Sequence, residues 1–132
     1  MVLSKDEMNF YNDQGYLLVE DVISKDQHNE MLALVKDFFE KSKIVNVNNN
    51  IFDLEDGHSS TNPRLKRVKQ PHQHSQFFWD IIKQSKIEGI LVDLLGKDVS
   101  LKTSKLNTKA PGGGAAVEWH QDWAFYPHTN DN

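Results

Sequence analysis

The spacing of apolar residues over the first 96 positions predicts a series of amphipathic helices. Ser4 and Glu7 form a capping box, which predicts a first helix that ends near Gly15, a residue typical of helix ends. Residues 16–19, which read Tyr-Leu-Leu-Val directly after this glycine, are typical of a short strand.

The second helix has the clearest signal. Ser24 and Gln27 form another capping box, with Asp26 as the alternative N-cap. The apolar residues that follow repeat at helical spacing and predict one buried stripe, made of Met31, Leu34, Val35, Phe38 and Phe39.

The character of the chain changes after this helix. Residues 43–63 are rich in asparagine and predict a polar loop, with a short turn near residues 51–52. A loop of this length is either a binding loop or a tolerated surface insertion. Residues 64–69 then alternate charged and apolar side chains, which predicts a strand with a basic face of Arg64, Lys66 and, if the register slips, Arg67.

Helical spacing returns from about residue 75 and ends at Gly96, with a break near residues 85–86. Residues 99–107 and 117–123 are then predicted as strands, on either side of a turn at Pro111-Gly112-Gly113-Gly114. This order, helices first and strands last, predicts an α+β fold.

Composition narrows the function classes. The chain has 132 residues and a formal net charge of −4, which argues against a nucleic-acid partner. It has no apolar run near the ~18 residues that span a bilayer and no apolar leader, so we expect no membrane association. It has no cysteine, which excludes disulfides, thiolate zinc sites and iron–sulfur clusters and fits a cytoplasmic protein.

The main chemical signal is His120-Gln121-Asp122. In a strand, residues two apart share a face with Cα atoms about 6.5 Å apart, so His120 and Asp122 are able to converge on one cation. An imidazole and a carboxylate are two of the three ligands in the facial triad that holds non-haem Fe(II). The alternative is a surface ion pair between the two side chains.

The surroundings of this motif resemble the phytanoyl-CoA dioxygenase family. The resemblance is strongest over residues 105–128, where the family pattern is a strand ending in Lys, a Pro/Gly-rich turn, a strand like Trp119-His120-Gln121-Asp122 and an aromatic-Pro tail. Residues 10–19 and Leu94-Leu95-Gly96 are similar to earlier parts of the family pattern. The resemblance implies an Fe(II)- and 2-oxoglutarate-dependent dioxygenase on a double-stranded β-helix (jelly-roll), using O₂ to hydroxylate a small organic substrate.

The resemblance also implies roles for single residues. His120 and Asp122 match iron ligands, and Gln121 matches the position between them beside metal and cosubstrate. Lys105 matches a position that lines the 2-oxoglutarate pocket. Arg67 matches a basic position that contacts the cosubstrate, although Lys66 or Lys69 are alternatives for that position.

The resemblance further implies a histidine ligand and a distal arginine that these residues do not supply. We therefore expect the chain to be an amino-terminal fragment: one domain over residues 1–132, mainly helical over 1–98, with the barrel beginning at 99–132. Two alternatives stay open. In the first, His128 is the third ligand of a small metal site. In the second, the chain is a non-catalytic small-molecule or metal-binding protein that retains the front half of the fold. Oligomeric state and substrate identity have no signal in the sequence.

Overall fold

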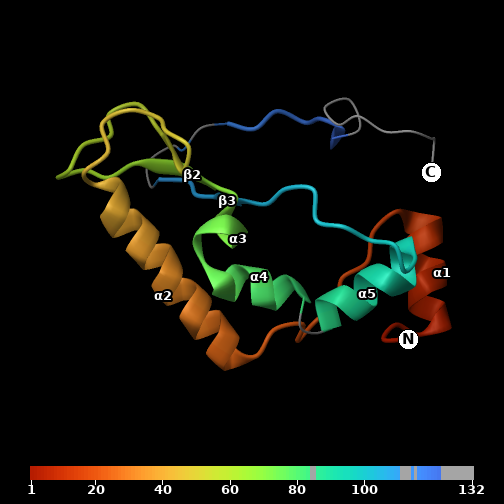
Figure 1. Cartoon of the computed structure of the whole chain (residues 1–132). Coiled ribbons are helices and arrows are strands. Elements are labelled where there is room, and N and C mark those ends of the chain that lie inside the picture. Colours follow the sequence, from red (N-terminus) through yellow and green to blue (C-terminus); the bar gives the residue numbers. More distant parts are fainter. Residues whose placement is uncertain (84–85, 111–113, 115, 123–132) are drawn as a thin grey trace.

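The computed structural model describes residues 1–83, 86–110, 114 and 116–122 of the 132-residue chain. Helices and one small sheet both occur in this part, which confirms the α+β class (Figure 1). The elements run in the order α1 (Lys5–Gln14), α2 (Lys25–Ser42), β1 (Phe52–Leu54), β2 (Leu65–Lys69), α3 (Pro71–His74), α4 (Gln76–Lys83), α5 (Lys86–Leu95) and β3 (Lys105–Asn107). The predicted order was wrong, because β1 and β2 lie between α2 and α3.

The first two helices begin as predicted, because their caps are local chemistry. The Glu7 backbone N–H donates to Ser4 Oγ over 3.2 Å, and the Gln27 N–H donates to Ser24 Oγ over 3.1 Å. The side chains of Glu7 and Gln27 in turn accept from the backbone N–H groups of the two serines, so both capping boxes are complete. The alternative N-cap, Asp26, was therefore wrong. Gly15 ends α1 with φ of 78°, a left-handed conformation that glycine adopts without steric cost.

The sheet is antiparallel, in the order β1-β2-β3, and contains one irregularity in its register. Phe52 pairs with Val68, and Leu54 pairs with Leu65, so β2 has one residue more than β1 between these pairs. That extra residue is Lys66, which makes a β-bulge. The bulge places Leu65 and Val68, three positions apart, on the same buried face, and it confirms the predicted slip that turns Arg67 to the other face.

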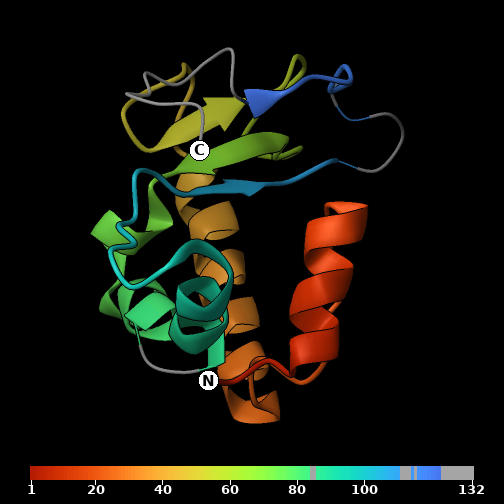
Figure 2. The ribbon, with the colours of Figure 1, turned by 90° about the vertical axis from the view of Figure 1, so that its right-hand side faces the viewer.

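The core forms where two helices cover one face of this sheet. Phe38 of α2 contacts Phe52 with ring centroids 6.3 Å apart and Phe78 of α4 at 6.2 Å. These rings pack against Leu65 and Val68, both fully buried. Of the stripe predicted on α2, Phe38 is buried and the other four residues are half-buried. Figure 2 shows the sheet at one end of the molecule with the helices on one side of it, which leaves its other face for polar side chains.

Three predicted strands differ from the structure. Residues 16–19 are not a strand, residues 99–107 contribute only β3, and residues 117–122 are not in a strand, while Trp123 lies outside the described residues. A strand needs the backbone of a neighbour to satisfy its N–H and C=O groups. Within the described part, β3 is an edge strand of the sheet, and no strand pairs with residues 117–122. A double-stranded β-helix is therefore not confirmed by these three strands.

The asparagine-rich segment after α2 is tied to the fold by its own polar side chains. Asn49 Oδ1 accepts bonds from the backbone N–H groups of Ile51 and Phe52, both at 2.8 Å. His58 Nδ1 accepts from the Arg64 N–H at 2.9 Å, and Nε2 lies 3.1 Å from the Ser42 carbonyl oxygen. These two contacts leave His58 half-buried. A binding role for this segment stays a prediction.

No helix among the described residues is both long and apolar enough to cross a lipid bilayer. The longest, α2, carries charged side chains on its wet side, including an ion pair between Asp37 and Lys41 at 2.6 Å. The predicted cytoplasmic location stays a prediction.

The amino terminus is fastened to α5 through Asp93. The backbone N–H groups of Leu3 and Val2 donate to Asp93 Oδ2 over 2.9 and 2.5 Å. These two donors, Leu3 first, lower the pKa of Asp93 below its ordinary value of 3.8. The contact carries the Leu3 side chain into a buried position, with 3% of its surface exposed.

This contact is expected to depend on pH. A carboxylate whose pKa is lowered by folding stabilises the fold above its unfolded value of 3.8 and loses that contribution as the pH falls through the lower folded value. The Leu3 amide resonance is therefore expected to move in NMR spectra as the pH falls below 3.8. In Asp93→Asn this movement should vanish. An equal movement in both proteins would contradict the contact.

Candidate functional site

His120 and Asp122 lie side by side in the structure. His120 Nε2 is 3.2 Å from Asp122 Oδ1, and both side chains are exposed, at 44% and 66%. Neighbouring ligand atoms that bind one metal at about 2.1 Å each are separated by about 3 Å. The observed spacing therefore suits a shared cation and equally describes the surface ion pair that the sequence left as the alternative.

A backbone contact fixes the orientation of the imidazole. His120 Nδ1 lies 2.7 Å from the Glu118 carbonyl oxygen, so in the neutral ring Nδ1–H donates to that oxygen and Nε2 carries the lone pair. Metal-binding histidines commonly donate their second ring N–H to a carbonyl in this way. The donor set, one imidazole nitrogen beside one carboxylate oxygen, fits part of an Fe(II) site.

The described residues bring two candidate ligands together and no third. Over the described ranges, which stop at residue 122, no group of three His, Asp or Glu side chains is placed to hold a metal ion. His128 lies outside the described residues. Trp119 is fully exposed, and Gln121 is exposed as well.

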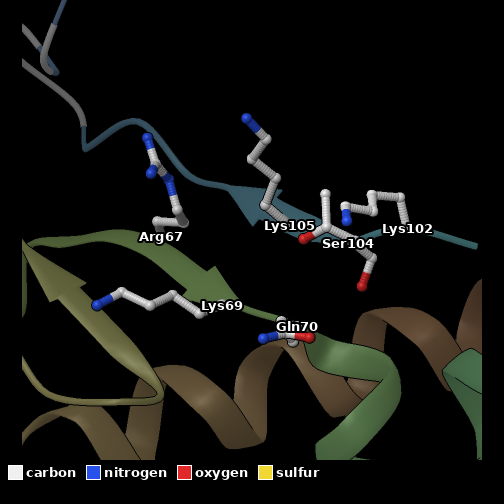
Figure 3. A pocket seen from close by; sticks show the side chains of 7 residues that line it. Arg67, Lys69, Gln70, Lys102, Ser104 and Lys105 are labelled. Atoms are coloured by element: carbon white, nitrogen blue, oxygen red, sulfur yellow. The ribbon is translucent and has the colours of Figure 1, made fainter. Parts of the chain in front are cut away.

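A second group of predicted residues lines a cavity of about 310 Å³ on the polar side of the sheet, hereafter the basic pocket (Figure 3). Arg67 and Lys105, predicted from different parts of the chain, both line it, whereas Lys66 does not. The complete lining is Arg67, Lys69, Gln70, Lys102, Thr103, Ser104 and Lys105. The sheet brings these residues together, because β2 supplies the first two and β3 with its preceding segment supplies the last four.

Asp53 forms ion pairs with two of the cations that line the basic pocket, Arg67 and Lys69. Lys69 Nζ is 2.8 Å from Asp53 Oδ1, and Arg67 Nη1 is 3.7 Å from Oδ2 of the same carboxylate. Arg67 Nε also donates to Asn107 Oδ1 across the β2–β3 pair at 3.1 Å. A carboxylate and an amide thus hold the guanidinium in place at the sheet surface.

Sequence reasoning missed several residues of the basic pocket. Lys69 was named only as an alternative to Arg67, although it lies two positions after Arg67 on the same strand and so shares its face. Lys102 and Ser104 had no signal, since their place depends on which strand β3 pairs with. The structure places Arg67 and Lys105 in the lining of one pocket and His120 beside Asp122, and neither His120 nor Asp122 lines that pocket.

Before any relative is considered, these features define the class of protein: an α+β chain with a histidine–carboxylate pair and a pocket lined by basic side chains. The model of the phytanoyl-CoA dioxygenase (PhyH) family matches residues 11–132. The chain belongs to this family.

Curated relatives agree with this assignment. The chain is 37% identical over 122 residues to a probable alpha-ketoglutarate-dependent hypophosphite dioxygenase of Stutzerimonas stutzeri, covering 92% of this chain and 42% of the relative. It is 22% identical over 126 residues to an ectoine dioxygenase of Nocardia farcinica, covering 96% of this chain and 40% of that protein. The chain thus spans about two fifths of the length of these relatives. No solved structure matches it.

Proposed function

We propose that the protein containing this chain is an Fe(II)- and 2-oxoglutarate-dependent dioxygenase that hydroxylates a small molecule with O₂. The observation that carries the proposal is the pairing of His120 Nε2 with Asp122 Oδ1, with Nδ1 held by the Glu118 carbonyl. Membership of the family and the alpha-ketoglutarate-dependent activity named for the relative at 37% identity support it.

His120 and Asp122 would hold the iron, and Gln121 between them would lie beside metal and cosubstrate. When bound, the iron supplies activation of O₂ coupled to decarboxylation of 2-oxoglutarate. The protein's own contribution is to fix the imidazole through Glu118 and to keep both ligands on one side of the chain. We place the third ligand outside the described residues, and likewise the arginine expected for the distal carboxylate.

Arg67 and Lys105 would hold the cosubstrate. 2-Oxoglutarate is a dianion at neutral pH, and charge-assisted hydrogen bonds from guanidinium and ammonium groups bind carboxylates well. Both side chains face the basic pocket, and Arg67 is already held by Asp53 and Asn107. Holding the guanidinium before the ligand arrives reduces the entropy lost on binding.

We expect Lys105→Gln to raise the KM for 2-oxoglutarate by about tenfold, the loss of one charge-assisted bond, with a smaller change in kcat. Succinate formation by the protein from its complete coding sequence, supplied with Fe(II), measures both constants. Lys66→Gln is the matched control, because it removes the same charge from β2 outside the basic pocket. Equal effects of the two changes would refute the assignment of Lys105 to the cosubstrate. If the unchanged protein forms no succinate, the alternative of a non-catalytic binding protein is favoured instead.

Two substrate classes are candidates. The sequence predicts a small organic substrate, as in the ectoine dioxygenases at 22% and 23% identity. The relative at 37% identity favours a second candidate, the inorganic oxyanion hypophosphite. The same succinate assay with either compound added separates them, since a substrate raises succinate formation above the level with 2-oxoglutarate alone.

A further inference from the structure

The two faces of β3 carry different side chains. Along β3 and the residue on each side of it, half-buried positions alternate with exposed ones: Ser104, Leu106 and Thr108 are half-buried, and Lys105 and Asn107 are exposed. Leu106 packs against the core, whereas Figure 3 shows Lys105 pointing to the same side as Arg67, away from the helices. A shift of β3 by one residue would exchange its faces and turn Lys105 away from the basic pocket.

The pairing of β3 with β2 does little by itself to hold this register. β3 has three residues, so few backbone hydrogen bonds join it to β2. Lys69 and Lys105 are directly opposite each other, and like charges placed in this way destabilise a sheet. Lys69 lies instead against Asp53, with 2.8 Å between Nζ and Oδ1. The register of β3 therefore depends on contacts of its half-buried face.

His72 of α3 makes one such contact at the start of β3. Its Nδ1 lies 2.5 Å from Ser104 Oγ, and the Gln70 backbone N–H donates to the Ser104 carbonyl oxygen over 2.9 Å. Ser104 is thus held through both its side chain and its backbone. At the other end of β3, the Thr108 hydroxyl donates to the Leu65 carbonyl oxygen. The half-buried face of β3 is fastened at both ends.

His72 is itself held in place by packing. Its ring stacks on Trp79 of α4, with centroids 5.6 Å apart and planes 30° apart. Lys83 Nζ lies 4.9 Å from the centroid of the Trp79 ring. α3 begins at Pro71, a buried residue whose ring restricts the backbone of the first turn. Because the imidazole is already ordered by these contacts, its bond to Ser104 costs less side-chain entropy.

We propose that His72 is a positioning residue for the cosubstrate: through Ser104 it fixes the register of β3 and so keeps Lys105 on the pocket face. Neighbouring side chains of a strand point to opposite faces, so holding Ser104 on the helix side directs Lys105 to the other side. The same register brings Asn107 within 3.1 Å of Arg67 Nε. His72 does not line the basic pocket, so its effect passes through Ser104. The inference rests on the proposed function, which assigns Lys105 to 2-oxoglutarate.

Two substitutions in the protein from its complete coding sequence test the inference. Ser104→Ala removes the hydroxyl, and His72→Phe removes the ring nitrogen but keeps an aromatic ring against Trp79. Calorimetric titration with 2-oxoglutarate, with Fe(II) under nitrogen to prevent turnover, gives the dissociation constant, and succinate formation in air gives kcat. We expect each change to raise the dissociation constant about fivefold, the loss of one hydrogen bond, and to change kcat by less than about twofold.

Two further variants separate positioning from a general loss of stability. The double variant should bind 2-oxoglutarate no more weakly than either single variant, because both changes remove the same contact. Ser104→Thr keeps the hydroxyl and should restore binding. Ser42→Ala is the matched control, because it removes a buried serine hydroxyl that donates to the Phe39 carbonyl oxygen outside the basic pocket. We expect the control to lower the free energy of unfolding and to leave the dissociation constant unchanged.

The possible failures are distinct. If 2-oxoglutarate binds Ser104→Ala and His72→Phe as tightly as the unchanged protein, the contact is only structural, and the inference fails with the proposed function intact. Equal weakening by Ser42→Ala, or additive effects in the double variant, would overturn the inference too. If the unchanged protein does not bind 2-oxoglutarate at all, the cosubstrate assignment is contradicted and the inference falls with it.

Discussion

Asp122→Ala is expected to abolish iron-dependent decarboxylation of 2-oxoglutarate by the protein from its complete coding sequence. The substitution removes the carboxylate oxygen that lies 3.2 Å from His120 Nε2 and leaves the imidazole alone at the proposed metal position. Because changes to residues that merely orient ligands already cost 10–100-fold, loss of a ligand itself should cost on the order of 100-fold or more. Succinate formation and Fe(II) affinity measured side by side give the result.

Glu118→Gln is the matched control for this change. It alters a neighbouring acidic side chain but keeps the backbone carbonyl that accepts from His120 Nδ1. Circular dichroism of both variants checks that the fold is retained. Undiminished turnover by Asp122→Ala would exclude Asp122 as a ligand and would leave the contact as a surface ion pair.

Phe38→Ala is expected to cause the largest loss of stability. Phe38 is 5% exposed and joins α2 to β1 through Phe52 and to α4 through Phe78. Truncating a buried phenylalanine leaves a cavity and costs about 3–5 kcal/mol, a large share of a total stability of about 5–15 kcal/mol. The free energy of unfolding from urea titration measures the loss.

Phe10→Ala provides the comparison for this measurement. Phe10 also contacts an aromatic ring, with its centroid 5.4 Å from that of Tyr16, but its side chain is 43% exposed. The same chemical change there removes little buried surface, so we expect a loss below about 1 kcal/mol. Similar losses from the two variants would contradict a core centred on Phe38.

The parts of the fold that were predictable are those set by neighbouring residues. Both capping boxes and the left-handed Gly15 follow from contacts within four positions, and so the bounds of α1 and α2 agree with the prediction. Strands depend on partners far along the chain. Residues 16–19 have the side chains of a strand but no paired neighbour in the described part, whereas β1 formed in a segment predicted to be a polar loop.

The candidate site also has one part set by neighbouring residues and one part set by the pairing of distant strands. The His120 and Asp122 pair was predictable, because two residues separated by one are close in any extended backbone. For the basic pocket, the resemblance indicated Arg67 and Lys105 singly. That they face one cavity together with Lys102 follows from the pairing of β2 with β3, 40 residues apart at Arg67 and Asn107, which no local pattern specifies.

The bulge at Lys66 has a consequence for comparing this chain with its relatives. Without Lys66, the order Leu65-Arg67-Val68-Lys69 would alternate regularly between the core face and the pocket face. Loss of a single residue from a strand ordinarily exchanges its two faces, but loss at this position preserves them. A relative that lacked only the residue matching Lys66 would therefore keep Arg67 and Lys69 on the pocket face and Leu65 and Val68 in the core.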